Sequence, residues 1–263
     1  MFRNLHQGED ILLLPNAWDP GSARLLASLG FRALATTSSG FAATLGRLDG
    51  SVSREEALAH CRAISAATDL PVTADLENGF ADDPRGVGET VAMAAETGVA
   101  GCSIEDFTGN REAPIYDLPL ALERVAAAVE SAHAGPRPLV LTARAENHLH
   151  GVDDLEDTIA RLRAYAAAGA DVLYAPGLSR LEDIRAVVAA VDRPLNVLAL
   201  PGCPSVPELA AAGVRRVSVG GAFAFVAMAA LVEAATELRD SGTYGFMERA
   251  RSGSRAVWGA FSG

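Results

Sequence analysis

Hydrophobic and polar positions follow one repeating order along the chain. Short apolar runs of strand length alternate with longer Ala- and Leu-rich stretches in which apolar residues recur at helical spacing. This order predicts parallel strands joined by right-handed helical crossovers. Because eight such units close a barrel, we predict a (β/α)8 TIM-type barrel. The eight predicted strands are 11–18, 32–39, 71–77, 101–107, 138–146, 171–177, 194–200 and 215–221.

Helices are expected between these strands, and several of them end in a glycine directly after the last apolar residue. An open doubly wound sheet is the alternative fold, but no GxGxxG follows an early strand. We assign residues 1–240 to a single barrel domain and 241–263 to a helical tail. The aromatic residues of this tail predict docking on its own barrel or on a neighbouring subunit. The predicted helices are 20–30, 53–68, 86–98, 118–134, 153–168, 179–191, 205–212 and 222–239.

The composition narrows the function and the location. A formal net charge of −11 repels phosphate backbones, so we expect no nucleic-acid partner. All 22 basic residues are arginine, which excludes Schiff-base aldolases, pyridoxal phosphate enzymes and Walker A loops, since each needs a lysine. Three widely spaced cysteines, no signal peptide and no apolar segment of membrane-spanning length predict a cytoplasmic protein without a membrane partner.

Acidic residues stand at the ends of neighbouring predicted strands. Asp75 and Glu77 alternate in the stretch "PVTADLENGF", so a strand would place both side chains on one face. Glu105 ends the next strand, and the strand ends of a barrel meet at its carboxyl-terminal face. Carboxylates gathered there need a hard cation. Oxygen ligands without a His or Cys cluster favour Mg²⁺, with Mn²⁺ as the alternative, over Zn²⁺.

Other strand ends carry groups that would bind a small carboxylate. Arg144 ends the fifth strand and is suited to clamp a substrate carboxylate. The turn at Ser39, Gly40 and Phe41 offers backbone amides for the same carboxylate or for an enolate oxygen, and Trp18 would form a wall. Together with the metal, these groups predict a site that stabilises a pyruvate-like enolate. The loop histidines His148 and His150 are interpreted as solvent-exposed side chains.

These residues lie in segments that resemble the isocitrate lyase/phosphoenolpyruvate mutase superfamily. The segments are "PNAWDPGSARL", "TTSSGFAATLGRLDG", "TADLENGF", "SIEDF", "ARAEN" and "ADVLYAPG", and they occur in the order and at the spacing typical of that superfamily. The resemblance implies a Mg²⁺-dependent barrel that makes or breaks C–C or P–C bonds of 2-oxo or 2-hydroxy acids. It also implies a homo-oligomer, a dimer or a tetramer that exchanges its C-terminal helices.

The resemblance assigns a role to each matching position. It implies that Asp75 binds the metal directly, that Glu77 is a second acid of the metal site and that Glu105 is a ligand mostly through water. Asp49 is similar to an acid that lies over the site in many members, so it is a candidate catalytic residue together with Arg144. Asn196, on the seventh strand, resembles a substrate-binding asparagine of the lyases.

The chain departs from the superfamily after the fourth strand. The lyases carry a loop with a catalytic cysteine there, whereas this chain reads "DFTGNREAPIYDLP". We therefore expect a lyase or decarboxylase that acts on a small 2-oxo or 2-hydroxy dicarboxylate without the usual cysteine. The alternatives are a phosphonomutase or phosphonopyruvate hydrolase, with Arg111 near the phosphonyl group, and a non-catalytic barrel that binds a metal and a 2-oxo acid.

Overall fold

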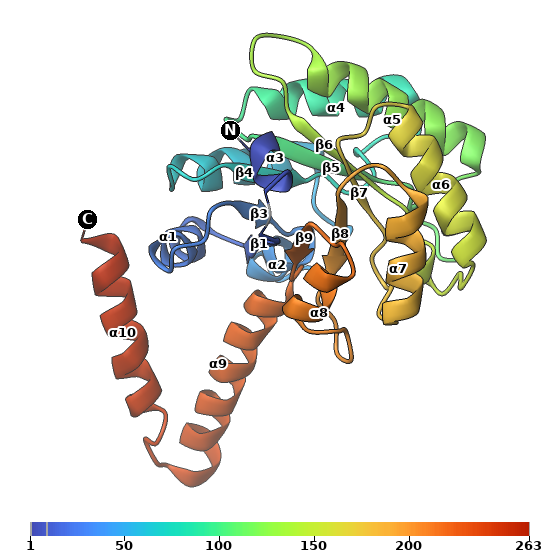
Figure 1. Cartoon of the computed structure of the whole chain (residues 1–263). Coiled ribbons are helices and arrows are strands. Elements are labelled where there is room, and N and C mark those ends of the chain that lie inside the picture. Colours follow the sequence, from blue (N-terminus) through green and yellow to red (C-terminus); the bar gives the residue numbers. More distant parts are fainter. Residues whose placement is uncertain (1, 9, 263) are drawn as a thin grey trace.

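The computed structural model describes residues 2–8 and 10–262. In this part of the chain, nine parallel strands form one sheet in the order β1-β9-β8-β7-β6-β5-β4-β3-β2. Each predicted strand is present, and the predicted TIM-type barrel is confirmed (Figure 1). The strands are β1 (Leu12–Leu14), β2 (Asn16–Ala17), β3 (Leu34–Thr36), β4 (Val72–Asp75), β5 (Gly101–Glu105), β6 (Val140–Arg144), β7 (Val172–Tyr174), β8 (Leu195–Leu198) and β9 (Arg216–Ser218).

The first predicted strand is divided at Pro15, and this division closes the barrel. β1 pairs with β9, whereas β2 pairs with β3, so the two halves join the two edges of the sheet. Proline has no N–H to donate to a ladder, but the carbonyl of Pro15 accepts a hydrogen bond from the Ala35 amide at 3.0 Å. The Asn16 side chain accepts from the amides of Val219 and Gly220 at 3.0 and 2.9 Å, which ties β2 to the end of β9.

Helices surround the barrel, and polar side chains fix where many of them begin (Figure 1). At α1, α3, α4, α5 and α6 an Asp or Ser side chain accepts a hydrogen bond from a first-turn amide, an arrangement worth about 1 kcal/mol per helix. The helices are η1 (Arg3–His6), α1 (Pro20–Ser28), α2 (Ser38–Thr44), α3 (Arg54–Ala66), α4 (Pro84–Ala95), α5 (Leu118–His133), η2 (His148–His150), α6 (Leu155–Ala167), α7 (Leu181–Ala190), α8 (Val206–Ala211), α9 (Ala222–Ser241) and α10 (Met247–Phe261).

Apolar side chains fill the amino-terminal end of the barrel. Phe2, beside the short turn η1, is buried in one cluster with Leu12, Leu14, Val140 and Val172. Larger clusters lie between the sheet and the surrounding helices. Because this end is closed by packing, the barrel interior is accessible from the carboxyl-terminal ends of the strands, which we call the mouth.

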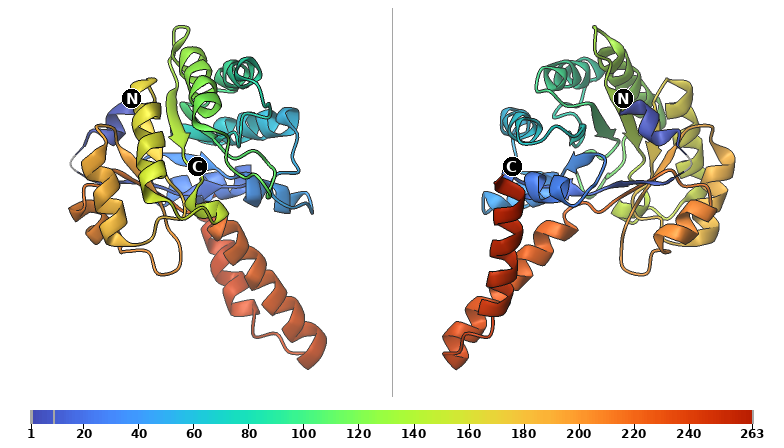
Figure 2. Two further views of the ribbon diagram at one scale, coloured as in Figure 1. Left: turned by 90° about the vertical axis from the view of Figure 1, so that its right-hand side faces the viewer. Right: turned by 60° about the vertical axis from the view of Figure 1, so that its left-hand side comes forward.

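The last two helices leave the barrel. Figures 1 and 2 show α9 and α10 as a helical pair that extends away from the other elements. The predicted helix 222–239 is present, but Ala224 is the one buried residue of α9 and none is buried in α10. The end of α10 returns to α1, where Arg24 lies 5.3 Å from the ring centre of Phe261. Among the described residues, none of the helices has the length and apolar character needed to cross a membrane.

Candidate active site

A polar cavity opens at the mouth of the barrel. Its inner part has a volume of about 170 Å³ and is lined by residues from several strand ends. An outer part of about 700 Å³ lies toward the loops that follow β3 to β6. Ser38, Asp49, Arg144 and Leu149 line both parts, so the two form one continuous space. Asp75 lines the inner part, while Glu77 and Glu105 line the outer part.

Arg144 is the centre of the site. Its Nη1 donates to Asp75 at 3.0 Å, Nη2 lies 3.1 Å from Glu105, and Nε donates to Glu146 at 2.8 Å. The guanidinium carbon lies 5.1 Å from the ring centre of Tyr174. Burial alone would lower the pKa of Arg144, but the three carboxylates outweigh it and raise this pKa well above its usual value. Arg144 is therefore a permanent cation with three N–H groups already engaged.

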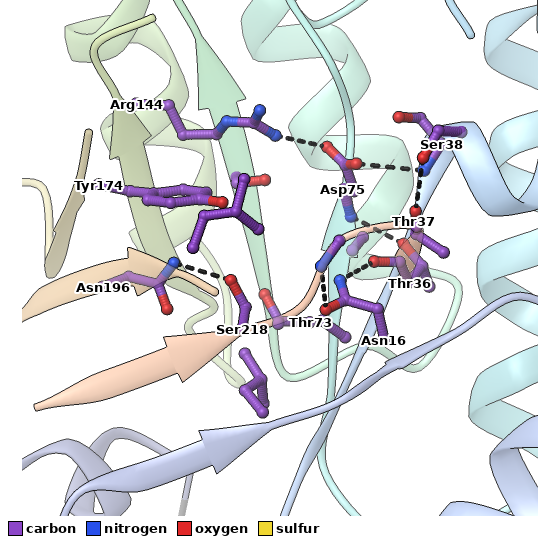
Figure 3. Close-up of a pocket in the computed structure, with 18 of the residues that line it drawn as sticks. Asn16, Thr36, Thr37, Ser38, Thr73, Asp75, Arg144, Tyr174, Asn196 and Ser218 are labelled. Atoms are coloured by element: carbon purple, nitrogen blue, oxygen red, sulfur yellow. Dashed lines mark hydrogen bonds and ion pairs between the residues drawn. The ribbon is translucent and has the colours of Figure 1, made fainter. Parts of the chain in front are cut away.

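Asp75, the last residue of β4, is held from two sides. Its Oδ1 accepts from Arg144, and its Oδ2 accepts from the Ser38 amide at 3.1 Å (Figure 3). The backbone amide of Asp75 donates to the Thr36 hydroxyl at 2.8 Å. These contacts fix the carboxylate at the point where the ends of β3, β4 and β6 meet, as the sequence predicts for a barrel.

Glu77 reaches the site by a turn, which the sequence did not predict. β4 ends at Asp75, and Glu77 has φ of +48°, a left-handed conformation that costs a non-glycine residue about 1–3 kcal/mol. Strand alternation therefore does not place Glu77 beside Asp75. The turn does, because the Glu77 amide donates to Asp75 Oδ1 at 3.4 Å. Burial, and then the charges of Asp75 and Asp49, raise the pKa of Glu77 to about 8.

The other acids at the mouth are also destabilised as anions. Burial raises the pKa of Glu105 well above its usual range, against the opposing effect of Arg144. Asp49 lies on the exposed loop between α2 and α3. Its carboxyl group is nevertheless partly desolvated, and this desolvation together with the charge of Asp75 raises its pKa. If these acids were ionised together, their negative charge would exceed what Arg144 neutralises, and burial together with this excess raises their pKa values.

The acids gathered around Arg144 allow the predicted metal site to be tested. Among residues 2–8 and 10–262, no three His, Cys, Asp or Glu side chains are arranged as a complete metal-binding group. A magnesium ion does not need one, since it keeps several waters and takes one or two carboxylates directly. The oxygen-only donors and the raised pKa values fit a divalent cation. Asp75, Glu77 and Glu105 are the side chains that would hold it.

The predicted substrate-binding turn forms a short helix instead. Thr37 precedes α2, and its hydroxyl accepts from the Gly40 amide at 3.3 Å, so this amide is engaged. Ser38 and Ser39 line the inner cavity. Gly40 is buried behind them: a Cβ there would lie 2.6 Å from the Thr37 methyl group and 3.1 Å from Trp18 Cβ.

Two further predicted contacts lie outside the cavity lining. Phe41 stacks on His60 with ring centres 3.9 Å apart, and the carbonyl of Trp18 contacts His60 Nε2 at 3.0 Å. Neither Phe41 nor Trp18 is among the residues that line the two parts of the cavity. The stacking on His60 of α3 explains the aromatic side chain of Phe41 without a substrate contact, whereas Trp18 contacts His60 through its backbone.

Asn196 lines the inner cavity, together with residues that sequence reasoning did not choose. Its amide nitrogen donates to Ser218 Oγ at 2.9 Å (Figure 3). Its oxygen accepts from Arg216 at 2.9 Å. Tyr174 and Ser218 line the same space. Both are the last residues of their strands, β7 and β9, and this position is the signal that could have identified them.

The loop after β5 contributes to the outer cavity. Phe107 and Ile115 form a bridge across it, and Asn110 caps its tip by accepting from the Glu112 amide at 3.0 Å. Arg111 lines the outer cavity. His150, which the sequence analysis interpreted as an exposed side chain, also lines the outer cavity and is half-buried.

The fold and the site define a TIM-type barrel with a cluster of acids around one arginine at its mouth. Comparison with known proteins identifies the family. Residues 2–239 match the family model of phosphoenolpyruvate phosphomutase. An oxaloacetate decarboxylase of Paraburkholderia xenovorans is 31% identical over 250 residues, which cover 92% of this chain and 82% of that protein.

Two solved structures are similar over most of their length. A Burkholderia cenocepacia protein, suggested to be a lyase/mutase, is 53% identical with a TM-score of 0.92, covering 94% of this chain and 89% of the other. A 2,3-dimethylmalate lyase is 30% identical with a TM-score of 0.84, covering 93% and 88%. The chain belongs to the isocitrate lyase/phosphoenolpyruvate mutase superfamily, and the prediction of a C–C bond lyase of this type is confirmed at that level.

Proposed function

We propose that the protein is a Mg²⁺-dependent lyase or decarboxylase that acts on a small 2-oxo or 2-hydroxy dicarboxylate through a pyruvate-like enolate. The surplus of buried carboxylates around Arg144 is the observation that carries this proposal, because a cation and an anionic substrate would complete the charge balance. The inner cavity of about 170 Å³ suits a substrate of a few carbon atoms. Similarity to an oxaloacetate decarboxylase and a 2,3-dimethylmalate lyase supports the same substrate class.

Arg144 is the carboxylate clamp in this proposal. A guanidinium has five N–H groups, and Nε and one N–H on each Nη contact acids of the protein. The second N–H of each Nη is then available for the parallel, bidentate contact that arginine makes with a carboxylate. The hydroxyl of Ser39, which lines the same cavity, would orient the other end of the substrate.

The acids have two separate tasks. Asp75, Glu77 and Glu105 would hold the cation, which when bound supplies a Lewis acid for the developing enolate oxygen. Asp49 would accept the proton of a 2-hydroxyl group before C–C cleavage. Its raised pKa makes this carboxylate a stronger base than an ordinary aspartate.

Phosphonate chemistry is the second candidate function. Arg111 lines the outer cavity together with Arg144, so two cations face the space where a phosphonyl group would lie. The rest of the cavity contributes acids, which repel a dianionic phosphonate. We therefore rank this function below the lyase.

The test is proton NMR of the purified protein with Mg²⁺ and a panel of oxaloacetate, substituted malates, 2-methylisocitrate and phosphonopyruvate. The proposal predicts pyruvate or glyoxylate formation that disappears in excess chelator and in the Asp75→Ala variant. Turnover that is unchanged in chelator would contradict the metal-dependent mechanism. Cleavage of phosphonopyruvate alone, lost in Arg111→Gln, would favour the second function.

We further propose that α9 and α10 pack against a second copy of the chain. Large apolar side chains on this pair are exposed, including Leu231 at 69%, Val232 at 64% and Trp258 at 72%. Such a surface is costly to leave in water. Light scattering should give a dimer or tetramer for the full chain. A monomer at micromolar concentration would contradict this assembly.

A further inference from the structure

The proposed site holds a clamp, a metal-binding set of acids and Asp49 as the base for a 2-hydroxyl group, and the proton donor to carbon is still to be assigned. Cleavage of a C–C bond leaves an enolate whose carbon must take up a proton. Cys61 and Cys102 are fully buried, and burial raises the pKa of the Cys61 thiol to about 12. With no lysine in the chain, histidine is the remaining side chain that is typical of proton transfer in enzymes.

Four of the five histidines lie away from the cavity. His6 is buried at the base of the barrel, and His133 pairs there with Asp171 at 2.9 Å. His60 contacts the Trp18 carbonyl behind α2. His148 pairs with the exposed Asp153 at 3.1 Å. His150 is the histidine that lines the outer cavity, with Glu77, Glu105 and Arg144 as its neighbours in that lining.

His150 is held in place from two directions. Its ring stacks on Phe107 with centres 3.8 Å apart and an interplanar angle of 6°. Its Nε2 lies 3.6 Å from Oε2 of Glu146, which is 1% exposed, and its backbone amide donates to the Glu146 carbonyl at 3.1 Å. The other carboxylate oxygen of Glu146 accepts from Arg144 Nε. Glu146 therefore links the substrate clamp directly to the imidazole.

This arrangement gives the two ring nitrogens different roles. A carboxylate beside one nitrogen of an imidazole orients the ring. Glu146 faces Nε2, which leaves Nδ1 as the exchanging nitrogen, and Nδ1 makes no hydrogen bond within residues 2–8 and 10–262. The side chain is 23% exposed, so the ring can recover a proton from solvent after each turnover.

We propose that His150 is the proton donor to carbon and that Glu146 is its positioning residue; this rests on the lyase or decarboxylase function proposed above. In the decarboxylase reaction, the C3–C4 bond breaks, its electron pair forms the enolate, and CO₂ leaves. His150 then gives its Nδ1 proton to C3, pyruvate forms, and water returns a proton to the imidazole. In the reverse half-reaction, unprotonated Nδ1 removes a methyl proton of pyruvate, the C–H electron pair forms the C2–C3 double bond, and the carbonyl π pair moves to oxygen to give the enolate.

Exchange of the methyl protons of pyruvate tests the role of His150 separately from C–C bond cleavage. The wild-type protein with Mg²⁺ in D₂O should replace the methyl protons of pyruvate by deuterium, followed as the loss of the methyl signal in proton NMR. Because general acid–base groups contribute about 10²–10⁴-fold, His150→Gln should slow this exchange by at least about 100-fold. Its rate of CO₂ release from oxaloacetate should fall less than about tenfold, since protonation follows cleavage. Imidazole added to His150→Ala should restore exchange.

His148→Gln is the matched control, since His148 lies in the same turn η2 but does not line the cavity. It should exchange like the wild type. Glu146→Gln should slow exchange less than His150→Gln. Equal exchange rates in His150→Gln and the wild type would overturn the role of His150 and leave the proposed function intact. The same conclusion would follow if exchange and cleavage fell equally in both histidine variants. A wild-type protein that neither cleaves nor exchanges any substrate would overturn both.

Discussion

Glu105 and Asp106 are consecutive acids at the end of β5, yet Asp106 is buried in the core whereas Glu105 lines the cavity. Asp106 is sealed beneath α6: Oδ1 accepts from the Glu146 amide at 2.8 Å, and Oδ2 accepts from the Tyr165 hydroxyl at 2.6 Å and from Arg161 at 3.2 Å. Within the part of the chain that the structure describes, Glu105 has one ionic contact, to Arg144, and it lines the outer cavity.

The difference is one of charge balance. Around Asp106, Arg161 supplies the positive charge and donors satisfy both carboxylate oxygens, which is how a buried acid becomes part of the core. Around Glu105, the single cation Arg144 is shared among three carboxylates, those of Asp75, Glu105 and Glu146. Burial raises the pKa of Asp106 as well as that of Glu105, so the two acids differ in their hydrogen-bond partners and not in the direction of the pKa shift. A balanced cluster stabilises the fold, whereas a cluster with surplus charge that opens to a cavity is prepared for a ligand.

Arg144→Met should have the largest effect on activity. It removes the carboxylate clamp and leaves its three acids without a cation, so we expect kcat/KM to fall about a thousandfold, which corresponds to about 4 kcal/mol. Arg144→Lys keeps the charge but loses the planar fork, and it should recover only a small part of this loss. Steady-state kinetics and circular dichroism would measure both. Activity within tenfold of wild type in Arg144→Met would contradict the clamp.

Asp106→Asn should lower the stability of the fold and leave the activity nearly unchanged. The amide keeps an acceptor for the Glu146 N–H but removes the charge that faces Arg161, so the free energy of unfolding should fall by about 3 kcal/mol in urea titrations. Activity per folded molecule should stay within a factor of about three, because Asp106 contacts no substrate. Tyr165→Phe is the control that removes one hydrogen bond and keeps the ion pair, and it should cost about 1 kcal/mol. A stable but inactive Asp106→Asn would place this acid in the site.

The smallest effect concerns the pH dependence of the metal-free protein. The pKa of Glu77 is about 8 in the folded chain, above its ordinary value of 4.5. Between these values the folded state binds more protons than the unfolded state, so stability in EDTA should fall as pH rises from about 5 to 8. Glu77→Gln should flatten this part of the profile, measured as the thermal midpoint at several pH values. An identical slope in wild type and variant would show that Glu77 is not buried as an acid.

The barrel could be predicted from the sequence because each strand and helix carries its own hydrophobic pattern. Asp75, Glu105 and Arg144 could be chosen for the same reason, since strand ends of a barrel meet at one place. Glu77 was assigned to the site through strand alternation, whereas a left-handed turn brings it there. Tertiary contacts decide such details: the local sequence does not show that Thr37 engages the Gly40 amide.

His150 illustrates the same limit. The loop that carries it is polar, and a polar loop is ordinarily exposed. Its environment depends on Phe107, which comes from a different strand end, and on Glu146, whose backbone amide donates to Asp106. None of these partners can be read from the spacing of residues in one segment, because they meet only when the barrel closes.

The most direct test of the account is Mn²⁺ binding, followed by electron paramagnetic resonance of the free ion, with Asp75→Asn and Asp106→Asn as a matched pair. The account predicts that the wild type and Asp106→Asn bind one Mn²⁺ per chain more tightly in the presence of oxalate, and that Asp75→Asn binds none in the same range. Equal binding by Asp75→Asn and wild type, or loss of binding in Asp106→Asn alone, would contradict the assignment of the surplus acids at the mouth as the functional cluster.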